Sequence, residues 1–336
     1  MDEKQIRDRA REKMQGYCRV CPQCNGKACA GEVPGMGGLL TGSAFINNIE
    51  SLAMYHINLR TMHQIDEPDT TLKMFNHTFS SPIFVAPLTG ASYNMGGALT
   101  EAEFVSCLTE GAKEAGSLAF TGDGAEDEIY TAGLDALRST GLGIPIIKPR
   151  SMDSIKERIG QAEAAGAVAV GIDIDGAGLV TMAMKGHPVG PKTFYQLREL
   201  KSFTKLPLIL KGIMTVQEAE MAVEMGAEAI VVSNHGGRVL DGTPGVADVL
   251  PEIVERVKGE IFVFADGGVR NGIDALKMLA LGANAVLVGR PSIWSAFGGG
   301  AEGVGQMLEK MTAQLRHGML MTGCVNLKAI DYHVIY

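Results

Sequence analysis

The chain has 336 residues, a hydrophobic content of 46% and a formal net charge of −8 at pH 7. With no basic run in the sequence, this acidic balance argues against nucleic acid and anionic membranes as partners. The charged start Met1-Asp2-Glu3-Lys4 is not followed by an apolar signal segment and no stretch is long enough to span a bilayer, so we expect a cytoplasmic protein.

Four of the six cysteines lie together near the N-terminus, as Cys18-x-x-Cys21-x-x-Cys24-x₄-Cys29. In a chain without a secretory signal, clustered cysteines are more typical of a metal site than of disulfides. The spacing is similar to an iron–sulfur run with one extra residue before the last cysteine, and four cysteines also suit zinc. We therefore expect an iron–sulfur cluster or a zinc ion here, with a metal-free cysteine loop as the alternative.

Eight apolar segments alternate with helical patterns from residue 82 onward. They are 82–86, 117–121, 144–148, 167–173, 206–211, 227–233, 261–266 and 283–289. Four are preceded by a helix that ends at a glycine, namely Gly116, Gly166, Gly226 and Gly282, the residue that tolerates the left-handed position after a helix. Continuous apolar strands are typical of parallel sheets buried on both faces. The pattern predicts an α/β fold, a (β/α)₈ TIM barrel over residues 81–336 including a C-terminal tail, with residues 1–80 as a cysteine-containing extension and lid.

Two helix starts agree with this order of elements. Thr100-x-x-Glu103 and Thr215-x-x-Glu218 have capping-box spacing, and each follows a predicted strand and loop. A doubly wound open sheet uses the same units, but the chain lacks a Gly-x-Gly-x-x-Gly turn after its first strand. The barrel is therefore the preferred fold.

Polar residues recur where the predicted strands end. They are Lys148, Asp173, Lys211, His235 with Arg238, Asp266-Gly267-Gly268 with Arg270, and Gly289-Arg290. The catalytic residues of TIM barrels gather at these strand ends. A histidine can exchange a proton near neutral pH, and an arginine can hold a carboxylate with two hydrogen bonds. The Gly-Gly and Gly-Arg pairs after strands seven and eight predict a phosphate site, and hence a phosphorylated cofactor.

Several motifs together resemble one enzyme family. They are Ser233-Asn-His-Gly-Gly-Arg-Val-Leu-Asp-Gly242, Ala265-Asp-Gly-Gly-Val-Arg270, Leu279-Ala-Leu-Gly-Ala283 and Val288-Gly-Arg-Pro291. They look like the FMN-dependent α-hydroxy acid oxidases and dehydrogenases, of the glycolate oxidase and L-lactate dehydrogenase type. The similarity is dense from about Ile83 to Leu327 and thinner before it. The resemblance implies an oxidoreductase with bound FMN that converts a 2-hydroxy acid to a 2-oxo acid.

The resemblance also implies a role for individual residues. His235 would be the catalytic base, and Asp173 the carboxylate that steadies its imidazolium. Lys211 would lie beside the flavin and stabilise its reduced form, and Arg238 would clamp the substrate carboxylate. The ribityl and phosphate groups would be held by Asp266, Gly267, Gly268, Arg270, Gly289 and Arg290.

Three substrate contacts that the family normally has are missing from this chain. The segment 33–37 lacks the family's first tyrosine, and Gly143–Lys148 lacks a second one after strand three. A second arginine is replaced within Gly178-Leu-Val180, and the loop that follows is shortened to about 181–191. We expect a small-molecule 2-hydroxy acid that is larger than glycolate or differently shaped.

Two other flavoprotein functions are alternatives. One is an FMN-dependent isomerase of the isopentenyl diphosphate isomerase type, and the other is a flavin electron-transfer protein. Retention of His235 and Asp173 argues against the second, because flavin binding alone does not need an acid–base pair. From the family we expect a homo-oligomer. The oxidant that reoxidises the flavin is left open: it is oxygen, a quinone or an electron-acceptor protein such as an iron–sulfur protein.

Overall fold

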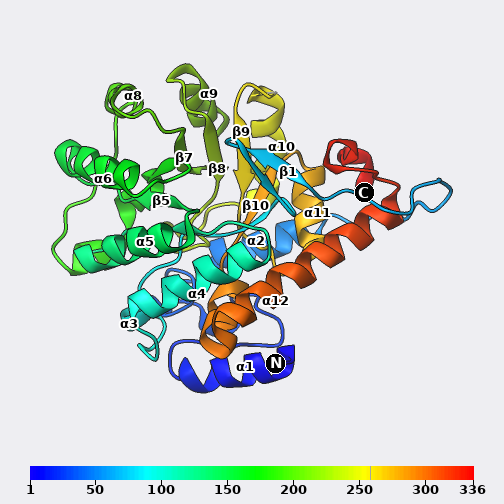
Figure 1. Cartoon of the computed structure of the whole chain (residues 1–336), viewed down its shortest axis with the longest axis horizontal. Coiled ribbons are helices and arrows are strands. Elements are labelled where there is room, and N and C mark those ends of the chain that lie inside the picture. The colour runs from blue at the N-terminus through cyan, green and yellow to red at the C-terminus, as the bar shows by residue number, and fades with distance from the viewer. Residues whose placement is uncertain (258) are drawn as a thin grey trace.

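A computed structural model describes residues 1–257 and 259–336 (Figure 1). Its centre is an eight-stranded parallel sheet in the order β3-β10-β9-β8-β7-β6-β5-β4. The strands are β3 (Ile83–Val85), β4 (Phe120–Thr121), β5 (Ile144–Ile147), β6 (Val170–Asp173), β7 (Leu208–Ile213), β8 (Ala229–Val232), β9 (Phe262–Ala265) and β10 (Ala285–Val288). A parallel bridge between Val85 and Ala119 joins the two ends of this order. The predicted TIM barrel is confirmed, and only β7 runs past its predicted segment.

A helix on the outside of the barrel follows each strand. These helices are α4 (Glu101–Glu114), α5 (Asp127–Thr140), α6 (Met152–Ala164), α8 (Phe194–Phe203), α9 (Val216–Glu224), α10 (Val246–Val257), α11 (Gly272–Ala280) and α12 (Arg290–Thr322), which is broken at Gly300. Short helices α3 (Ala91–Asn94), η2 (Ile174–Gly178) and α7 (Val180–Met184) lie in the loops after β3 and β6.

The predicted helix boundaries are reproduced with one difference. The four glycines after helices all have positive φ, from 66° at Gly116 to 103° at Gly282. Thr100 and Glu103 form a complete capping box. Thr215 caps α9 through its side chain, but the Glu218 carboxylate bonds to the Thr215 hydroxyl and not to its backbone N–H. Both helices still begin at the predicted residue.

The interior of the barrel is a packed apolar core. Alternate residues of each strand face opposite sides, so Ala229 and Val231 belong to the interior cluster while Ile230 and Val232 face the helices. Phenylalanines fill the interior, with the ring centroids of Phe120 and Phe264 5.4 Å apart. A hairpin of β1 (Leu72–Met74) and β2 (His77–Phe79) contributes to the same cluster. Polar chemistry is therefore displaced to the carboxyl ends of the strands.

The N-terminal residues pack along α12 and across the carboxyl end of the barrel (Figure 1). They form α1 (Glu3–Lys13), which contacts α12, then η1 (Lys27–Cys29) and α2 (Ser43–Ala53), which contacts α10. Leu39 N donates to Gly237 O at 2.8 Å, and Asn48 Nδ2 donates to Asn234 Oδ1 at 2.7 Å. These contacts hold the segment over the strand ends, and a domain boundary at residue 80 stays a prediction.

The C-terminal residues form η3 (Leu327–Ala329) and η4 (Tyr332–Val334). Ile335 makes an antiparallel bridge with Ile57, so the end of the chain is paired with the N-terminal extension. Among the described residues, none of the helices is both long and apolar enough to span a membrane.

Candidate active site

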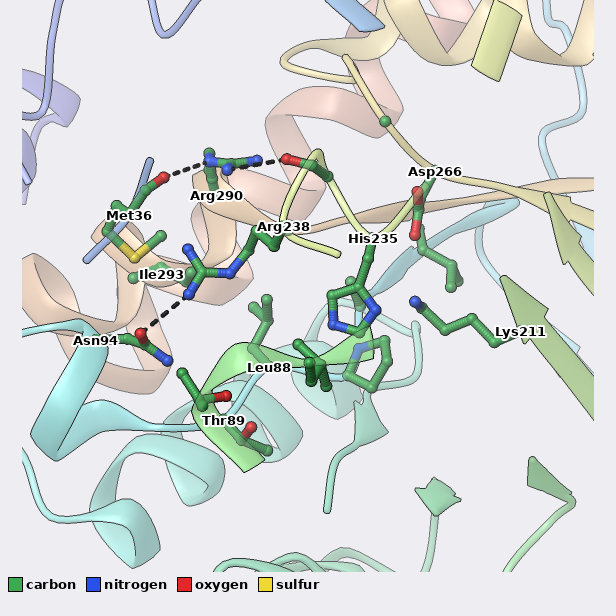
Figure 2. Close-up of a pocket in the computed structure, with 18 of the residues that line it drawn as sticks. Met36, Leu88, Thr89, Asn94, Lys211, His235, Arg238, Asp266, Arg290 and Ile293 are labelled. Carbon is green, nitrogen blue, oxygen red and sulfur yellow. Dashed lines mark hydrogen bonds between the residues drawn. The ribbon is translucent and has the colours of Figure 1, made fainter. Parts of the chain in front are cut away.

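A pocket opens at the carboxyl end of the barrel, and the segments after all eight strands contribute to it (Figure 2). The lining includes Leu88 and Thr89 after β3, Asp123 after β4, Lys148 after β5, Leu179 and Met182 after β6, Lys211 of β7, His235 and Arg238 after β8, Asp266 to Arg270 after β9, and Gly289 and Arg290 after β10. The predicted site residues other than Asp173 and the cysteines therefore meet in one cavity. Met36 adds a side chain from the N-terminal extension.

His235 faces two carboxylates, Asp173 at the end of β6 and Asp175 in η2. Its Nδ1 lies 3.0 Å from Asp175 Oδ1 and 3.6 Å from Asp173 Oδ1. His235 has a φ of 58°, an uncommon backbone conformation for a residue other than glycine. His235 lies three residues after the end of β8 at Val232, and its ring faces the pocket (Figure 2). Sequence reasoning missed Asp175, the nearer of the two carboxylates.

Asp173 is buried between two lysines. Lys148 Nζ contacts Asp173 Oδ2, and Lys211 Nζ donates to Asp173 Oδ1 at 3.1 Å. Burial alone would raise the pKa of Asp173, but Lys148, Lys211 and His235 outweigh it and hold that pKa well below its usual range. Asp173 is therefore an ionised carboxylate that anchors both ammonium groups.

Lys211 lies 3% exposed with its ammonium directed toward the pocket (Figure 2). Burial opposes its charge, but Asp173, Asp175 and Asp266 outweigh this effect and raise the pKa of Lys211. Burial raises the pKa of Asp266, partly offset by Lys211. Asp266 Oδ2 accepts from Ser233 at 2.8 Å, while its buried Oδ1 has no partner among the described residues. That oxygen is available to a ligand hydroxyl.

The segment after β9 forms a cradle for an anion. Gly267 and Gly268 have φ of 78° and 87°, and a Cβ at Gly268 would lie 2.4 Å from the backbone oxygen of Asn48. Arg270 donates from Nε to Cys24 O at 3.2 Å and from Nη1 to Val269 O at 3.0 Å. Its buried Nη2 has no partner among the described residues. A buried guanidinium nitrogen without a hydrogen-bond acceptor costs free energy. A bound phosphate would supply the missing acceptor.

The other two arginines are held by the chain itself. Arg238 Nη1 donates to Gly35 O at 2.6 Å. Its Nη2 donates to Asn94 Oδ1 at 3.0 Å (Figure 2). Arg290 Nε donates to Met36 O at 3.0 Å, and its guanidinium lies 3.6 Å from the centroid of the Phe45 ring. Burial lowers the pKa of each of these two arginines to about 10. Both arginines thus tie the N-terminal extension to the pocket.

An aromatic hydroxyl missed by sequence reasoning enters the pocket from α3. Tyr93 lines the cavity, and burial together with Glu101 raises its pKa to about 12. Two of the segments with missing family contacts present apolar side chains, namely Met36 from the extension and Leu179 from the segment 178–180, and the shortened loop adds Met182. The segment 143–148 contributes Lys148 to the pocket.

The four clustered cysteines lie outside this pocket and line a second cavity. All four are partly buried and free of disulfides. Burial raises the pKa of the Cys18 and Cys29 thiols, and the neighbouring cysteines raise both further. Met36, Arg290 and Ile293 line both cavities, so one layer of side chains separates them.

A family model described as FMN-dependent dehydrogenase matches residues 36–187 and 181–336 of the chain. The chain is 52% identical over 132 residues to 2-hydroxyacid oxidase 1 of Mus musculus, which covers 39% of this chain and 36% of that protein. It is 49% identical over 139 residues to L-lactate oxidase of a Nostoc species, which covers 41% and 38%. These alignments span less than half the length of either relative.

Solved structures are similar over nearly the whole chain. A crystal structure of mandelate oxidase superimposes with a TM-score of 0.80 at 27% identity, covering 98% of this chain and 96% of that one. A second, of a mandelate oxidase variant with a monooxide FMN adduct, has a TM-score of 0.74 at 30% identity and covers 92% and 98%. The barrel and its N-terminal extension thus have counterparts in these structures.

Proposed function

The chain belongs to the FMN-dependent dehydrogenase family, and on this basis we propose that it is an FMN-dependent oxidoreductase that oxidises a 2-hydroxy acid to a 2-oxo acid. The observation that carries the proposal is the convergence of His235, Lys211 and Arg238 on one pocket whose other side offers an anion cradle. An acid–base group, a fixed positive charge and a carboxylate ligand are the groups that this reaction needs.

The pocket fits FMN through two buried polar atoms that lack partners among the described residues. Arg270 Nη2 and the backbone of Gly267 and Gly268 would hold the phosphate, with Gly289 and Arg290 bordering it. Asp266 Oδ1 would accept from a ribityl hydroxyl. When bound, FMN supplies the acceptor for the hydride that leaves C2 of the substrate.

His235 takes the hydroxyl proton of the substrate in this proposal. The Asp175 carboxylate, 3.0 Å from Nδ1, holds the ring and stabilises the positive charge that it gains. Asp173 assists from 3.6 Å and keeps Lys211 in place. The Lys211 ammonium stabilises negative charge that arrives in the pocket. Arg238 would receive the substrate carboxylate, which then competes with Gly35 O and Asn94 for its donors.

The pocket has several apolar lining side chains, which support a substrate larger than glycolate. Leu88, Leu179, Met182 and the ring of Tyr93 line it. These side chains would contact an apolar substituent on C2, which glycolate lacks. The substrate class proposed is therefore a 2-hydroxy acid with an aliphatic or aromatic side chain.

Oxidation is favoured over the isomerase and electron-transfer alternatives. The relatives compared above are oxidases by name, and the His235–Asp175 contact has no purpose in simple flavin binding. The remaining expectations stay proposals: a homo-oligomer, an electron-acceptor protein as oxidant, a cytoplasmic location, and an iron–sulfur or zinc centre at the four cysteines. Light scattering during gel filtration tests the oligomer.

Product analysis tests the proposed reaction. The purified holoenzyme is incubated with glycolate, lactate, 2-hydroxyoctanoate and mandelate in the presence of an artificial electron acceptor, and 2-oxo acid is measured. We expect 2-oxo acid from the larger substrates and little from glycolate. If no 2-oxo acid forms from any of them while FMN is bound, the proposed reaction is wrong.

A further inference from the structure

The cavity of the four cysteines is enclosed largely by apolar side chains. Met14 at the end of α1, Val20, and Ile293 and Trp294 of α12 line it together with Cys18, Cys21, Cys24 and Cys29. Met14 and Val20 are fully buried, and Trp294 is 8% exposed. All four cysteines of this twelve-residue loop therefore surround one largely apolar cavity.

The first turn of this loop has a backbone that a β-branched residue rarely adopts. Val20 has a φ of 43°, and its N–H donates to the Cys18 sulfur at 3.4 Å. Strain of this kind persists only where the surroundings enforce it, and it gathers at functional sites. Two arginines of α1 enforce it here: Arg11 Nη2 donates to Val20 O at 3.1 Å, and Arg7 donates to Cys21 O.

Positive charge surrounds the cavity. Arg7 packs 4.9 Å from the Trp294 ring, Arg270 donates to Cys24 O, and Arg290 lines the cavity wall. Four thiolates on one metal centre leave a net negative charge, which buried guanidinium groups stabilise.

The sulfur spacing favours a cluster over a single zinc ion. Zinc with four thiolates at about 2.3 Å holds sulfurs only about 3.8 Å apart. Within residues 1–257 and 259–336, no three cysteine sulfurs lie within 4.8 Å of one another, although all four cysteines line the same cavity. A four-iron cluster binds each thiolate to a different iron, so its four thiolates need not meet at one ion.

We propose that Cys18, Cys21, Cys24 and Cys29 each bind one iron of a [4Fe–4S] cluster, and that the cluster carries electrons from the flavin pocket to a one-electron carrier protein. Met36, Arg290 and Ile293 form the shared wall between the two cavities. The relay rests on the proposed function, whereas cluster binding does not.

The electrons balance in this scheme. Oxidation of one 2-hydroxy acid delivers two electrons and one proton to the flavin as hydride, and one proton to His235. The reduced flavin returns two electrons to the cluster in two single steps and releases its proton. Two molecules of oxidised carrier protein each accept one electron from the cluster.

Metal and sulfide analysis tests the cluster. Anaerobically purified holoenzyme should contain about four irons and four acid-labile sulfides per chain. Cys21→Ser and Cys24→Ser should lose most of the iron and sulfide while keeping FMN. Cys107 lies in α4 and does not line the cavity, so Cys107→Ser should keep both iron and sulfide. The proposal would be overturned if the protein contained zinc without sulfide, or if it contained neither metal and its four thiols could all be titrated. Equal metal loss in Cys107→Ser would overturn it as well.

Electron paramagnetic resonance separates the relay from the reaction. After anaerobic addition of a substrate that reduces the flavin, the parental protein should show a reduced-cluster signal that Cys21→Ser lacks. A reduced flavin beside a cluster that only dithionite reduces would contradict the relay. A third outcome is a protein that contains iron and sulfide but whose flavin is reduced by none of the 2-hydroxy acids. That result would count against the proposed reaction and would still support the cluster.

Discussion

The carboxylate of Asp175 lies 3.0 Å from Nδ1 of His235, closer than the strand-end carboxylate of Asp173 at 3.6 Å. Asp173 is already paired with Lys148 and Lys211. Two tasks that one carboxylate could perform are thus divided between the end of β6 and the short helix η2 that follows it. Asp175 orients the histidine, and Asp173 anchors the lysines.

Asp175→Asn tests this division. The amide keeps the size of the side chain but removes the charge that stabilises protonated His235, so we expect flavin reduction to slow by about 10²-fold. FMN affinity and the substrate dissociation constant should change little. Rapid mixing under anaerobic conditions measures both the rate and its substrate dependence. Asp175→Glu should recover part of the rate; a parental rate in the asparagine variant would remove Asp175 from the mechanism.

Asp173→Asn should mainly affect stability. Breaking a buried ion pair by removing one partner costs about 3 to 5 kcal/mol. Because the folded pKa of Asp173 is lowered, its contribution is present above its unfolded pKa of about 3.9 and is lost as pH falls below that value. The difference in unfolding free energy from the parental protein should therefore be largest near neutral pH and shrink below pH ~4.

Urea denaturation between acidic and neutral pH measures this difference. Asp135→Asn is a suitable control, because the Asp135–Arg138 pair is exposed on α5. We expect at most about 1 kcal/mol from that control. A loss for Asp173→Asn that is independent of pH would show that its charge is not what stabilises the fold.

Arg270→Met should weaken FMN but not riboflavin. The unpaired Nη2 is proposed to meet the phosphate, which riboflavin lacks. Loss of a hydrogen bond to a charged group, worth about 1.5 to 3 kcal/mol, corresponds to a rise of roughly 10- to 150-fold in the FMN dissociation constant. Fluorescence titration of apoprotein with both flavins gives the comparison. Equal weakening of both flavins would mean that Arg270 shapes the pocket without binding phosphate.

Gly268→Ala should be more destabilising than Gly226→Ala. Both glycines have φ near 85°, so each substitution costs about 1 to 2 kcal/mol of backbone energy. A methyl group at Gly226 meets nothing within 4 Å, whereas at Gly268 it would lie 2.4 Å from Asn48 O. Thermal denaturation should show the larger loss for Gly268→Ala, together with weaker FMN binding. Equal losses of thermal stability in the two variants would indicate that α2 moves away from the added methyl group at little cost.

The barrel was predictable because local signals agree with one another. Apolar strands, capped helices and the glycines Gly116, Gly166, Gly226 and Gly282 repeat along the chain, and each repeat needs only its neighbours to be recognised. The polar strand ends followed from the same register. Their meeting in one pocket is a property of the closed barrel.

The details of the site depend on contacts between distant segments, which the sequence pattern does not carry. Asp175 was missed because it lies beyond the strand, in η2, and reaches His235 only through the turn of that helix. Tyr93 comes from a four-residue helix without a periodic signal. Arg238 and Arg290 both donate to backbone oxygens of residues 35–37, whose position over the mouth is set by tertiary packing.

Anaerobic single-turnover reduction of the flavin is the decisive test of the proposed reaction. The holoenzyme and His235→Gln are mixed with the best 2-hydroxy acid without any acceptor, and flavin bleaching and 2-oxo acid are measured together. We expect the flavin of the holoenzyme to bleach with matching 2-oxo acid formation, and His235→Gln, with FMN fully bound, to react at least about 10²-fold more slowly. Bleaching of His235→Gln at the parental rate, or bleaching without 2-oxo acid, would contradict the proposed reaction.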